Sequence, residues 1–152
     1  MGVEKSFKNV EVKILETIRE IQDQIISDFE LFDEWDEKYS YIIEMGRKLV
    51  PMPEHFKVDE NKIKGCQSTV WLASEVQDGS VIYYADSDAV IVKGLVSLLI
   101  KVFSNHKAEE IIANEPYFID KIGMQQHLSM TRSNGLAAMV KQMKMYAVAY
   151  SK

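Results

Sequence analysis

The chain has 152 residues, 47% hydrophobic and 27% charged, which is enough for one domain with a full hydrophobic core. The net charge of −5, with no run of Lys and Arg, argues against a nucleic-acid partner. A single cysteine excludes an internal disulfide, and no stretch of about 18 apolar residues indicates a membrane span. The charged N-terminus lacks the apolar core of a signal peptide, so we expect a soluble, cytoplasmic protein.

The first third of the chain predicts two helices. Ile14, Ile18, Ile21 and Ile25 recur at the spacing of one helical face. A second helix is predicted in EWDEKYSYIIEMGRKL, residues 34–49, and the two prolines of VPMPEHF end it. We expect the buried side of this second helix to consist of apolar and aromatic residues, namely Trp35, Tyr39, Ile42, Ile43 and Leu49.

After residue 66 the pattern changes to that of strands. In STVWLASEV the residues alternate between two faces of a strand. The apolar face has Val70, Leu72 and Val76, and the other face has Thr69, Trp71 and Glu75. An Asp-Gly turn signal in QDGS separates this segment from VIYYADS. The two segments therefore predict a β-hairpin with a tight turn, and Trp71 is expected to be a core residue.

The segment DSDAVIVKGLVSLLIKVF, residues 86–103, predicts an apolar helix at the centre of the domain. Its first residues, Asp86, Ser87 and Asp88, are suited to cap the helix. Gly94 lowers helix propensity inside this segment, so we expect a close packing contact there.

The remainder of the chain predicts two short helices and one long helix. NHKAEEIIAN and EPYFIDKIG form the short pair, with Pro116 in a first turn, and the long helix starts near LSMTRSNG with Ser129 as its N-cap. Its expected core residues are Leu136, Met139, Val140, Met143, Ala147 and Tyr150. The order of elements predicts an α+β fold: a single domain with a small antiparallel β-sheet packed with helices.

Cys66, the only cysteine, lies in NKIKGCQSTVWL just before the first strand. A free cysteine is usually a small buried hydrophobe, but this one has polar neighbours, and Gly65 permits a sharp turn that would present it at a loop tip. The thiolate is the reactive form of cysteine. Lys62 and Lys64 would favour that form modestly, because exposed lysines are screened by solvent.

Elimination narrows the chemistry open to a single thiol. A dithiol oxidoreductase needs a second cysteine, and iron–sulfur clusters and structural zinc need three or four soft ligands. None of His55, His106 and His127 lies in a cysteine-protease signature, and we interpret His127 as a packing or capping residue. No Thr-x-x-Cys motif indicates a peroxide-reactive enzyme. A lone thiol is still able to accept a group, hold it and pass it on.

Four segments in order resemble the SufE family of cysteine desulfuration proteins. They are EWDEKYSYIIEMGRKL, GCQSTVWL, ADSDAVIVKGL and QQHLSMTRSNGLAAM, and the resemblance covers about residues 33–143. It implies a SufE/IscU-like fold, shared with the iron–sulfur scaffold proteins of the IscU type. We expect one SufE-like domain over residues 1–152, with residues 1–30 as an N-terminal helical extension.

The resemblance also implies a function in iron–sulfur cluster biogenesis. Cys66 would take persulfide sulfur from a SufS-like cysteine desulfurase, stimulate its turnover and pass the sulfur to a SufB-SufC-SufD-type scaffold. The protein would then be a persulfide-carrying partner and not an autonomous enzyme, and we expect Cys66 to be shielded within its loop in the free protein and turned outward on the desulfurase. It would need no metal or cofactor of its own, because the pyridoxal phosphate belongs to the desulfurase.

Further residue roles follow from the same resemblance. Arg132 would contact the desulfurase, although an exposed arginine paired with a carboxylate is an equally simple reading of the sequence. Five residues would shape or support the cysteine loop: Gly65, Gln67, Ser68, Asp86 and Asp88. Three alternatives stay open: SufE or its paralogue CsdE, monomer or homodimer, and a sulfur carrier or an allosteric activator with an incidental cysteine.

Overall fold

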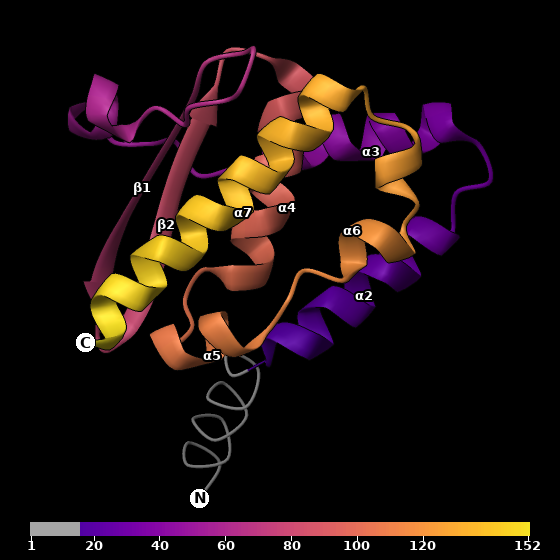
Figure 1. Cartoon of the computed structure of the whole chain (residues 1–152). Helices are drawn as coiled ribbons and strands as arrows, with labels where there is room; N and C mark the ends of the chain where they lie inside the picture. Colours follow the sequence, from indigo (N-terminus) through magenta and orange to yellow (C-terminus); the bar gives the residue numbers. More distant parts are fainter. Residues whose placement is uncertain (1–15) are drawn as a thin grey trace, which may run out of the picture.

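The structure is a computed structural model that describes residues 16–152, and in it one β-hairpin packs against helices (Figure 1). The elements in chain order are α2 (Ile18–Glu30), α3 (Trp35–Arg47), β1 (Val70–Gln77), β2 (Ser80–Ser87), α4 (Val90–Phe103), α5 (Ala108–Ala113), α6 (Phe118–Lys121) and α7 (Met130–Ser151). Short 3-10 turns occupy Glu54–Phe56, Asp59–Asn61 and Met124–Gln126. The predicted α+β class with a small antiparallel sheet is confirmed.

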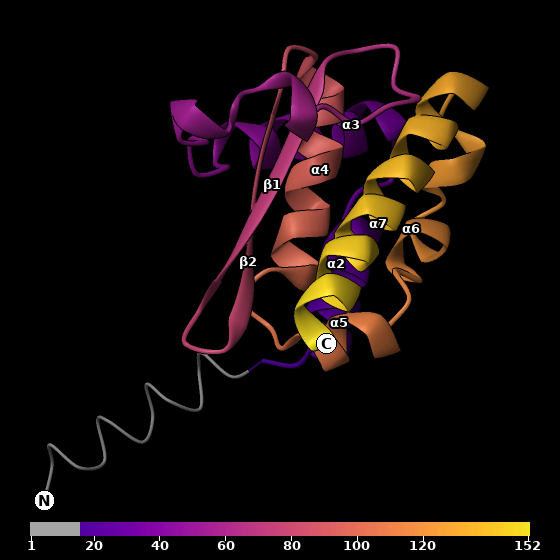
Figure 2. The ribbon, with the colours of Figure 1, turned by 60° about the vertical axis from the view of Figure 1, so that its left-hand side comes forward.

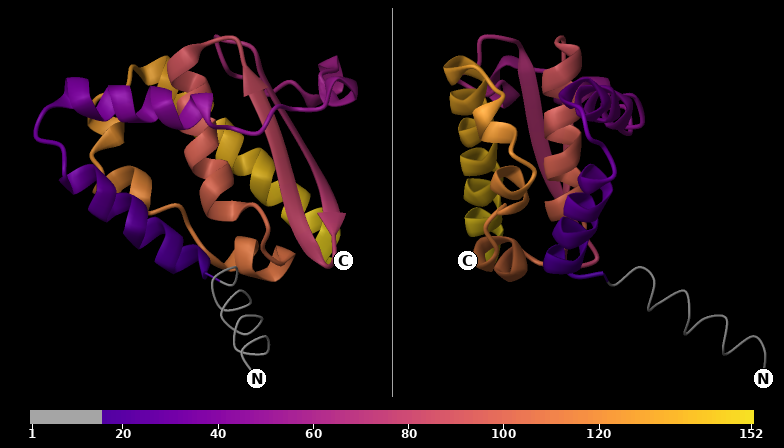
Figure 3. Two further views of the ribbon diagram at one scale, coloured as in Figure 1. Left: turned by 180° about the vertical axis from the view of Figure 1, so that it is seen from behind. Right: turned by 90° about the vertical axis from the view of Figure 1, so that its right-hand side faces the viewer.

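The arrangement places α4 between the hairpin and the N-terminal helices. Helix α4 packs against β2 on one side and against α3 on another, while α7 runs diagonally past the hairpin (Figures 2 and 3). The C-terminal end of α7 lies at the same end of the molecule as the turn of the hairpin (Figure 1), and Tyr150 there bonds to Ser74 of β1. The N-terminal end of α7 therefore lies at the opposite end of the sheet, where β1 begins.

No helix within residues 16–152 combines the length and hydropathy that a membrane span requires.

The hairpin forms where the alternation and the Asp-Gly signal predict it. The antiparallel register runs from Val70 opposite Ser87 to Gln77 opposite Ser80. Asp78 and Gly79 close the turn with φ angles of 52° and 80°, the left-handed pair that a type I′ turn requires. The turn residues therefore explain the register, because a two-residue turn leaves no freedom to slip by one position.

Two residues of β1 depart from the prediction. Val76 is 47% exposed, because it lies beside the turn, where the helical layer ends. Trp71 is not a core residue but half-buried on the outer face, where the Nζ atoms of Lys57 and Lys62 lie 5.8 and 6.0 Å from the centre of its ring. Alternation separates two faces of a strand correctly, but it does not say that a large aromatic residue must belong to the buried face.

Helix α4 is the centre of the core, as its apolar sequence predicts. The predicted close contact at Gly94 is confirmed, because a Cβ atom built there would lie 2.2 Å from the carbonyl oxygen of Ile42 in α3. Gly46 of α3 faces the same point, where its Cβ would lie 2.8 Å from the backbone nitrogen of Gly94. The two glycines let the backbones of α3 and α4 approach each other directly.

The other helices form largely as predicted, with differences at their margins. In α7, Tyr150 is 39% exposed and its hydroxyl bonds to that of Ser74 (2.9 Å), so it is not a core residue. Pro116 precedes α6 by two residues and lies outside its first turn. In α2 the predicted apolar face includes the buried Ile18 and Ile25. Ile14 and the rest of the expected extension up to residue 15 lie outside the described residues.

Candidate functional site

Cys66 lies in a loop whose two ends are tied together. The backbone nitrogen of Ile63 donates to the carbonyl oxygen of Val70 (2.8 Å), which closes the loop just before β1. Gly65 adopts a φ of 92°, a conformation that L side chains rarely take, so the turn before Cys66 requires a glycine. The sharp turn predicted from the sequence is therefore present.

The thiol does not point outward from a loop tip but is turned inward, as expected for a cysteine that is shielded in the free protein. Cys66 is half-buried, and its Sγ atom donates a weak hydrogen bond to the carbonyl oxygen of Gly135 in α7 (3.8 Å). Burial raises the pKa of the Cys66 thiol. We expected nearby lysines to favour the thiolate and so lower this pKa, but burial is its only resolved cause and raises it. Lys62 pairs instead with Asp59 (3.1 Å). Burial of Cys66 thus favours the protonated, less reactive form of the thiol.

This raised pKa predicts how alkylation of Cys66 depends on pH. The rate of reaction with iodoacetamide should reach its midpoint at a higher pH in the native protein than in the same protein unfolded in urea. By linkage, the stability that the protonated thiol contributes is present below its unfolded pKa and is lost as the pH rises through the folded pKa. Equal midpoints in the native and unfolded protein would contradict this burial effect.

A cavity of about 330 Å³ adjoins the thiol. Its apolar wall comes from Val92 and Leu95 of α4 and Met139 of α7. Its polar residues include Gln67, Ser68 and Arg132. The structure thus brings the cysteine loop, the start of α4 and the start of α7 to one place, although these segments are far apart in the sequence.

Arg132 takes part in the predicted cap of α7. Its backbone nitrogen donates to the hydroxyl of Ser129 (3.2 Å), which confirms Ser129 as the N-cap. Its side chain is exposed, and within residues 16–152 no carboxylate forms an ion pair with it. A cation in this first turn is disfavoured by the helix dipole. The structure therefore shows an exposed guanidinium at the thiol cavity, with no partner among the described residues to account for it.

The aspartates before α4 do not cap that helix, contrary to the prediction. Asp86 and Ser87 belong to β2, and the N-cap position of α4 is Ala89, without a side-chain hydrogen bond. The sequence pattern misleads here because the strand continues through residues that are also good helix caps.

The carboxylate of Asp86 instead joins two lysines. It lies 2.8 Å from Lys57 Nζ and 3.3 Å from Lys93 Nζ. Although burial opposes ionisation, hydrogen bonds from Lys57, from the backbone of Ser87 and from Lys93 lower the pKa of Asp86. These contacts connect β2, α4 and the segment before the cysteine loop, but none of them reaches Cys66.

Asp88 contacts the end of the cysteine loop directly. Its Oδ1 atom accepts a hydrogen bond from the backbone nitrogen of Thr69 (3.1 Å). The hydroxyl of Ser87 donates to the carbonyl oxygen of Thr69 (2.8 Å). Both polar groups of the Thr69 backbone are therefore held by the segment before α4, three residues after Cys66.

Sequence reasoning missed Gly135 and the apolar wall of the cavity. Gly135 is buried beneath Cys66, and a Cβ atom built on it would lie 3.1 Å from Sγ. The signal in the sequence was a glycine inside a helical segment, a residue type that is unfavourable there. Val92, Leu95 and Met139 carry no such signal, because any core residue at helical spacing looks the same.

The histidines lie in other surroundings. The ring of His127 stacks on Trp35 with ring centres 3.7 Å apart, which confirms the packing interpretation. His106 bonds to backbone oxygens of Ser104 and Glu16, and His55 lies against Phe56. In the part of the chain that the structure describes, no histidine or carboxylate lines the thiol cavity. Within residues 16–152, no group of three or more His, Cys, Asp or Glu side chains is placed to hold a metal ion.

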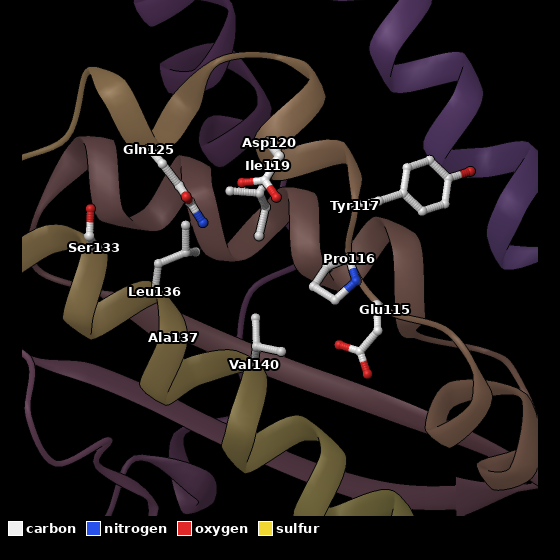
Figure 4. Close-up of a pocket in the computed structure, with 10 residues that line it drawn as sticks. All are labelled: Glu115, Pro116, Tyr117, Ile119, Asp120, Gln125, Ser133, Leu136, Ala137 and Val140. Atoms are coloured by element: carbon white, nitrogen blue, oxygen red, sulfur yellow. The ribbon is translucent and has the colours of Figure 1, made fainter.

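A second cavity, of about 390 Å³, lies between α7 and the segment around α6 (Figure 4). Ile119, Leu136 and Val140 supply apolar surface, and Glu115 and Asp120 add carboxylates. The described residues contribute no thiol, imidazole or basic group to its lining. The thiol cavity is therefore the better candidate for chemistry, because a nucleophile and a cation meet there.

Comparisons with known proteins agree with this placement. A family model described as "SufE: Fe-S metabolism associated domain" matches residues 23–147. An uncharacterized SufE-like protein of Rhizobium meliloti (strain 1021) is 42% identical over 127 residues, covering 80% of this chain and 91% of the relative. Another, from Rhizobium etli, is 41% identical over 127 residues, covering 80% of this chain and 86% of the relative.

A solved structure shares the fold at low sequence identity. The solution structure of a hypothetical protein from Thermus thermophilus superposes with a TM-score of 0.72 at 20% identity. The match covers 86% of this chain and 95% of that one. At this identity the likeness concerns the fold alone.

Proposed function

Because this chain belongs to the SufE family, whose domain is associated with Fe–S metabolism, we propose that it is a sulfur acceptor and carrier in iron–sulfur cluster biogenesis. One observation carries the proposal: the only thiol of the chain lies half-buried beside an apolar-walled cavity whose polar side holds an exposed arginine. A carrier needs a single nucleophile that is sheltered from solvent and close to a surface where a partner docks.

The proposed transfer is an exchange between a thiol and a persulfide. The Cys66 thiolate attacks the outer sulfur of a persulfide on a cysteine desulfurase, and a new S–S bond forms at Cys66. The S–S bond of the donor breaks, and the desulfurase cysteine leaves as a thiolate. No external oxidant is required, because the outer sulfur moves without a net change in the number of S–S bonds.

The partners proposed for these steps are a SufS-like desulfurase as donor and a SufB-SufC-SufD-type scaffold as acceptor. The pyridoxal phosphate that forms the donor persulfide belongs to the desulfurase. Among the described residues no histidine or carboxylate lines the thiol cavity, which supports a role as partner over that of an autonomous enzyme. The raised pKa of Cys66 supports it too, because activation would come with docking.

A half-buried site also suits the carried species. Persulfides and related sulfur species are readily reduced or oxidised further when exposed. Contact of Cys66 with α7 would limit such losses between the two partners. Protection of the carried sulfur requires that the thiol face inward, whereas transfer requires that it be accessible to the partner. A loop with a glycine turn before Cys66 is suited to change between these two positions.

The direct test is sulfur loading of the wild-type protein. After incubation with a SufS-like desulfurase, pyridoxal phosphate and cysteine, mass spectrometry should show one added sulfur atom, located on the peptide that contains Cys66. A wild-type protein that gains no sulfur under conditions in which the desulfurase turns over would remove the assignment.

We expect Arg132→Ala to weaken the action on the desulfurase. Loss of an exposed guanidinium at a docking surface typically weakens the free energy of binding by roughly 1–2 kcal/mol. The concentration of this protein needed for half-maximal stimulation of the desulfurase should therefore rise about 5- to 30-fold. The matched control is Lys141→Ala, which removes an exposed cation two to three turns further along α7. It should change the half-maximal concentration little. Equal shifts in the two variants would indicate general electrostatic attraction and no specific contact of Arg132.

A further inference from the structure

Gly135 occupies a position where its own helix gives no reason for a glycine. It lies inside α7, more than one turn from the Ser129 cap, and it is buried. Its backbone is not among those with positive φ, which are Gly65, Gly79 and Gly123 among the glycines of residues 16–152. Alanine is more favourable than glycine in the interior of a helix. The reason for the glycine must therefore lie in what packs against it.

The three atoms that a side chain added at Gly135 would meet first, outside its own helix backbone, all belong to Cys66. A Cβ atom built on Gly135 would lie 3.1 Å from Sγ of Cys66, 3.8 Å from its Cα and 3.8 Å from its Cβ. Only the first of these distances is shorter than ordinary van der Waals contact. The space above Gly135 is thus filled by the sulfur atom itself.

We propose that Gly135 is a positioning residue, whose missing side chain lets the thiol of Cys66 rest against α7 and so sets the reactivity of the free protein. The carbonyl oxygen of Gly135 also accepts the weak S–H hydrogen bond at 3.8 Å. Position 135 therefore supplies both the space and the acceptor for the inward conformation of the thiol.

A methyl group at this position would move the thiol before it moved the helix. Cys66 sits on a loop, next to the exposed Gly65 and Gln67, and none of the described residues lies within 4 Å of a Cβ built on Gly65. From Gly135 onward, helix α7 is held by buried residues on its core face, such as Leu136, Met139 and Met143. The sulfur therefore yields outward, toward solvent, where its ionised form is better hydrated.

This inference rests on the proposed function for its biological meaning, but its test uses only thiol chemistry of the free protein. Iodoacetamide rates are measured against pH for wild type, Gly135→Ala and Asn134→Ala. Asn134 is exposed in the same turn, so its replacement also raises helix propensity without adding an atom near the thiol. Gly135→Ala should react roughly threefold or more faster near neutral pH, with a lower midpoint, and Asn134→Ala should match wild type.

A thermal double-mutant cycle separates positioning from a general structural role. In the wild-type background Gly135→Ala should lower the melting temperature or leave it unchanged. In a Cys66→Ala background, which removes Sγ, the same replacement should raise it, because the helix gains a better residue. If Gly135→Ala alone does not fold, the double variant should.

Three results would overturn the proposal. They are an unchanged or slower alkylation rate in a folded Gly135→Ala protein, the same thermal effect in both backgrounds, and failure of the double variant to fold. Absence of sulfur loading in the wild type would instead remove the proposed function and leave the positioning of the thiol by Gly135 intact.

Discussion

Cys66→Ser is expected to abolish sulfur acceptance, with no added sulfur detected by mass spectrometry after incubation with a SufS-like desulfurase. The chain has no other thiol that could substitute for it. Serine has nearly the same shape, so the half-buried position next to Gly135 should tolerate it without loss of fold. Its hydroxyl is a far weaker acid and does not form a persulfide, so the loss should be complete and not graded.

The same variant separates a carrier from an allosteric activator. A carrier should lose stimulation of the desulfurase together with sulfur acceptance, because turnover then stalls at the donor persulfide. Retention of full stimulation by Cys66→Ser would favour the activator. A control protein, Cys66→Ser with Gln67→Cys, keeps one thiol in the loop at an exposed neighbouring position. It should accept little sulfur if position is decisive, and acceptance equal to wild type would show that any thiol in the loop suffices.

Gly94→Ala is expected to produce the largest loss of stability among single methyl additions in the core. The new Cβ would lie 2.2 Å from a backbone oxygen, that of Ile42, so no side-chain rotation is able to relieve the contact. Helices α3 and α4 would have to separate around residues that are otherwise fully packed. We expect a fall of roughly 3 kcal/mol in the free energy of unfolding, measured by urea denaturation.

The matched control for this effect is Gly135→Ala, which makes the same change inside another helix. Its new atom would meet a side-chain sulfur at 3.1 Å on a loop, which is able to move. Gly135→Ala should therefore lower the free energy of unfolding much less than Gly94→Ala does, although the intrinsic gain in helix propensity is the same. Equal losses at the two positions would contradict the interpretation that the approach of two backbones distinguishes Gly94.

Patterns with a short range along the chain predicted most of the architecture. The alternation in β1 and β2 and the Asp-Gly pair at 78–79 specify a hairpin, because side-chain period and turn geometry are local properties. The apolar run of α4 predicted its central position, and Gly94 predicted a close contact, although not its partner. The order of four segments along the chain also predicted the family, which the matching family model confirms.

Prediction from such local patterns was wrong where two kinds of secondary structure use similar residues. Asp86 and Ser87 suit a helix cap, yet the strand continues through them: Asp86 lies opposite Trp71 of β1, and the backbone nitrogen of Ser87 donates to the Asp86 carboxylate. Trp71 has an apolar side chain, but its place on the outer face of β1 was decided by which face the helices cover. Neither outcome is encoded within a few residues of the position concerned.

The candidate site divides in the same way. The sequence by itself identified the single thiol, the glycine turn before it and the cap that places Arg132 in the first turn of α7, since each depends on neighbours along the chain. Only the tertiary structure decided that the thiol turns inward onto Gly135, with a raised pKa, beside an apolar cavity. That outcome depends on how the loop, α4 and α7 pack together, and packing between distant segments follows from the shape of the whole core.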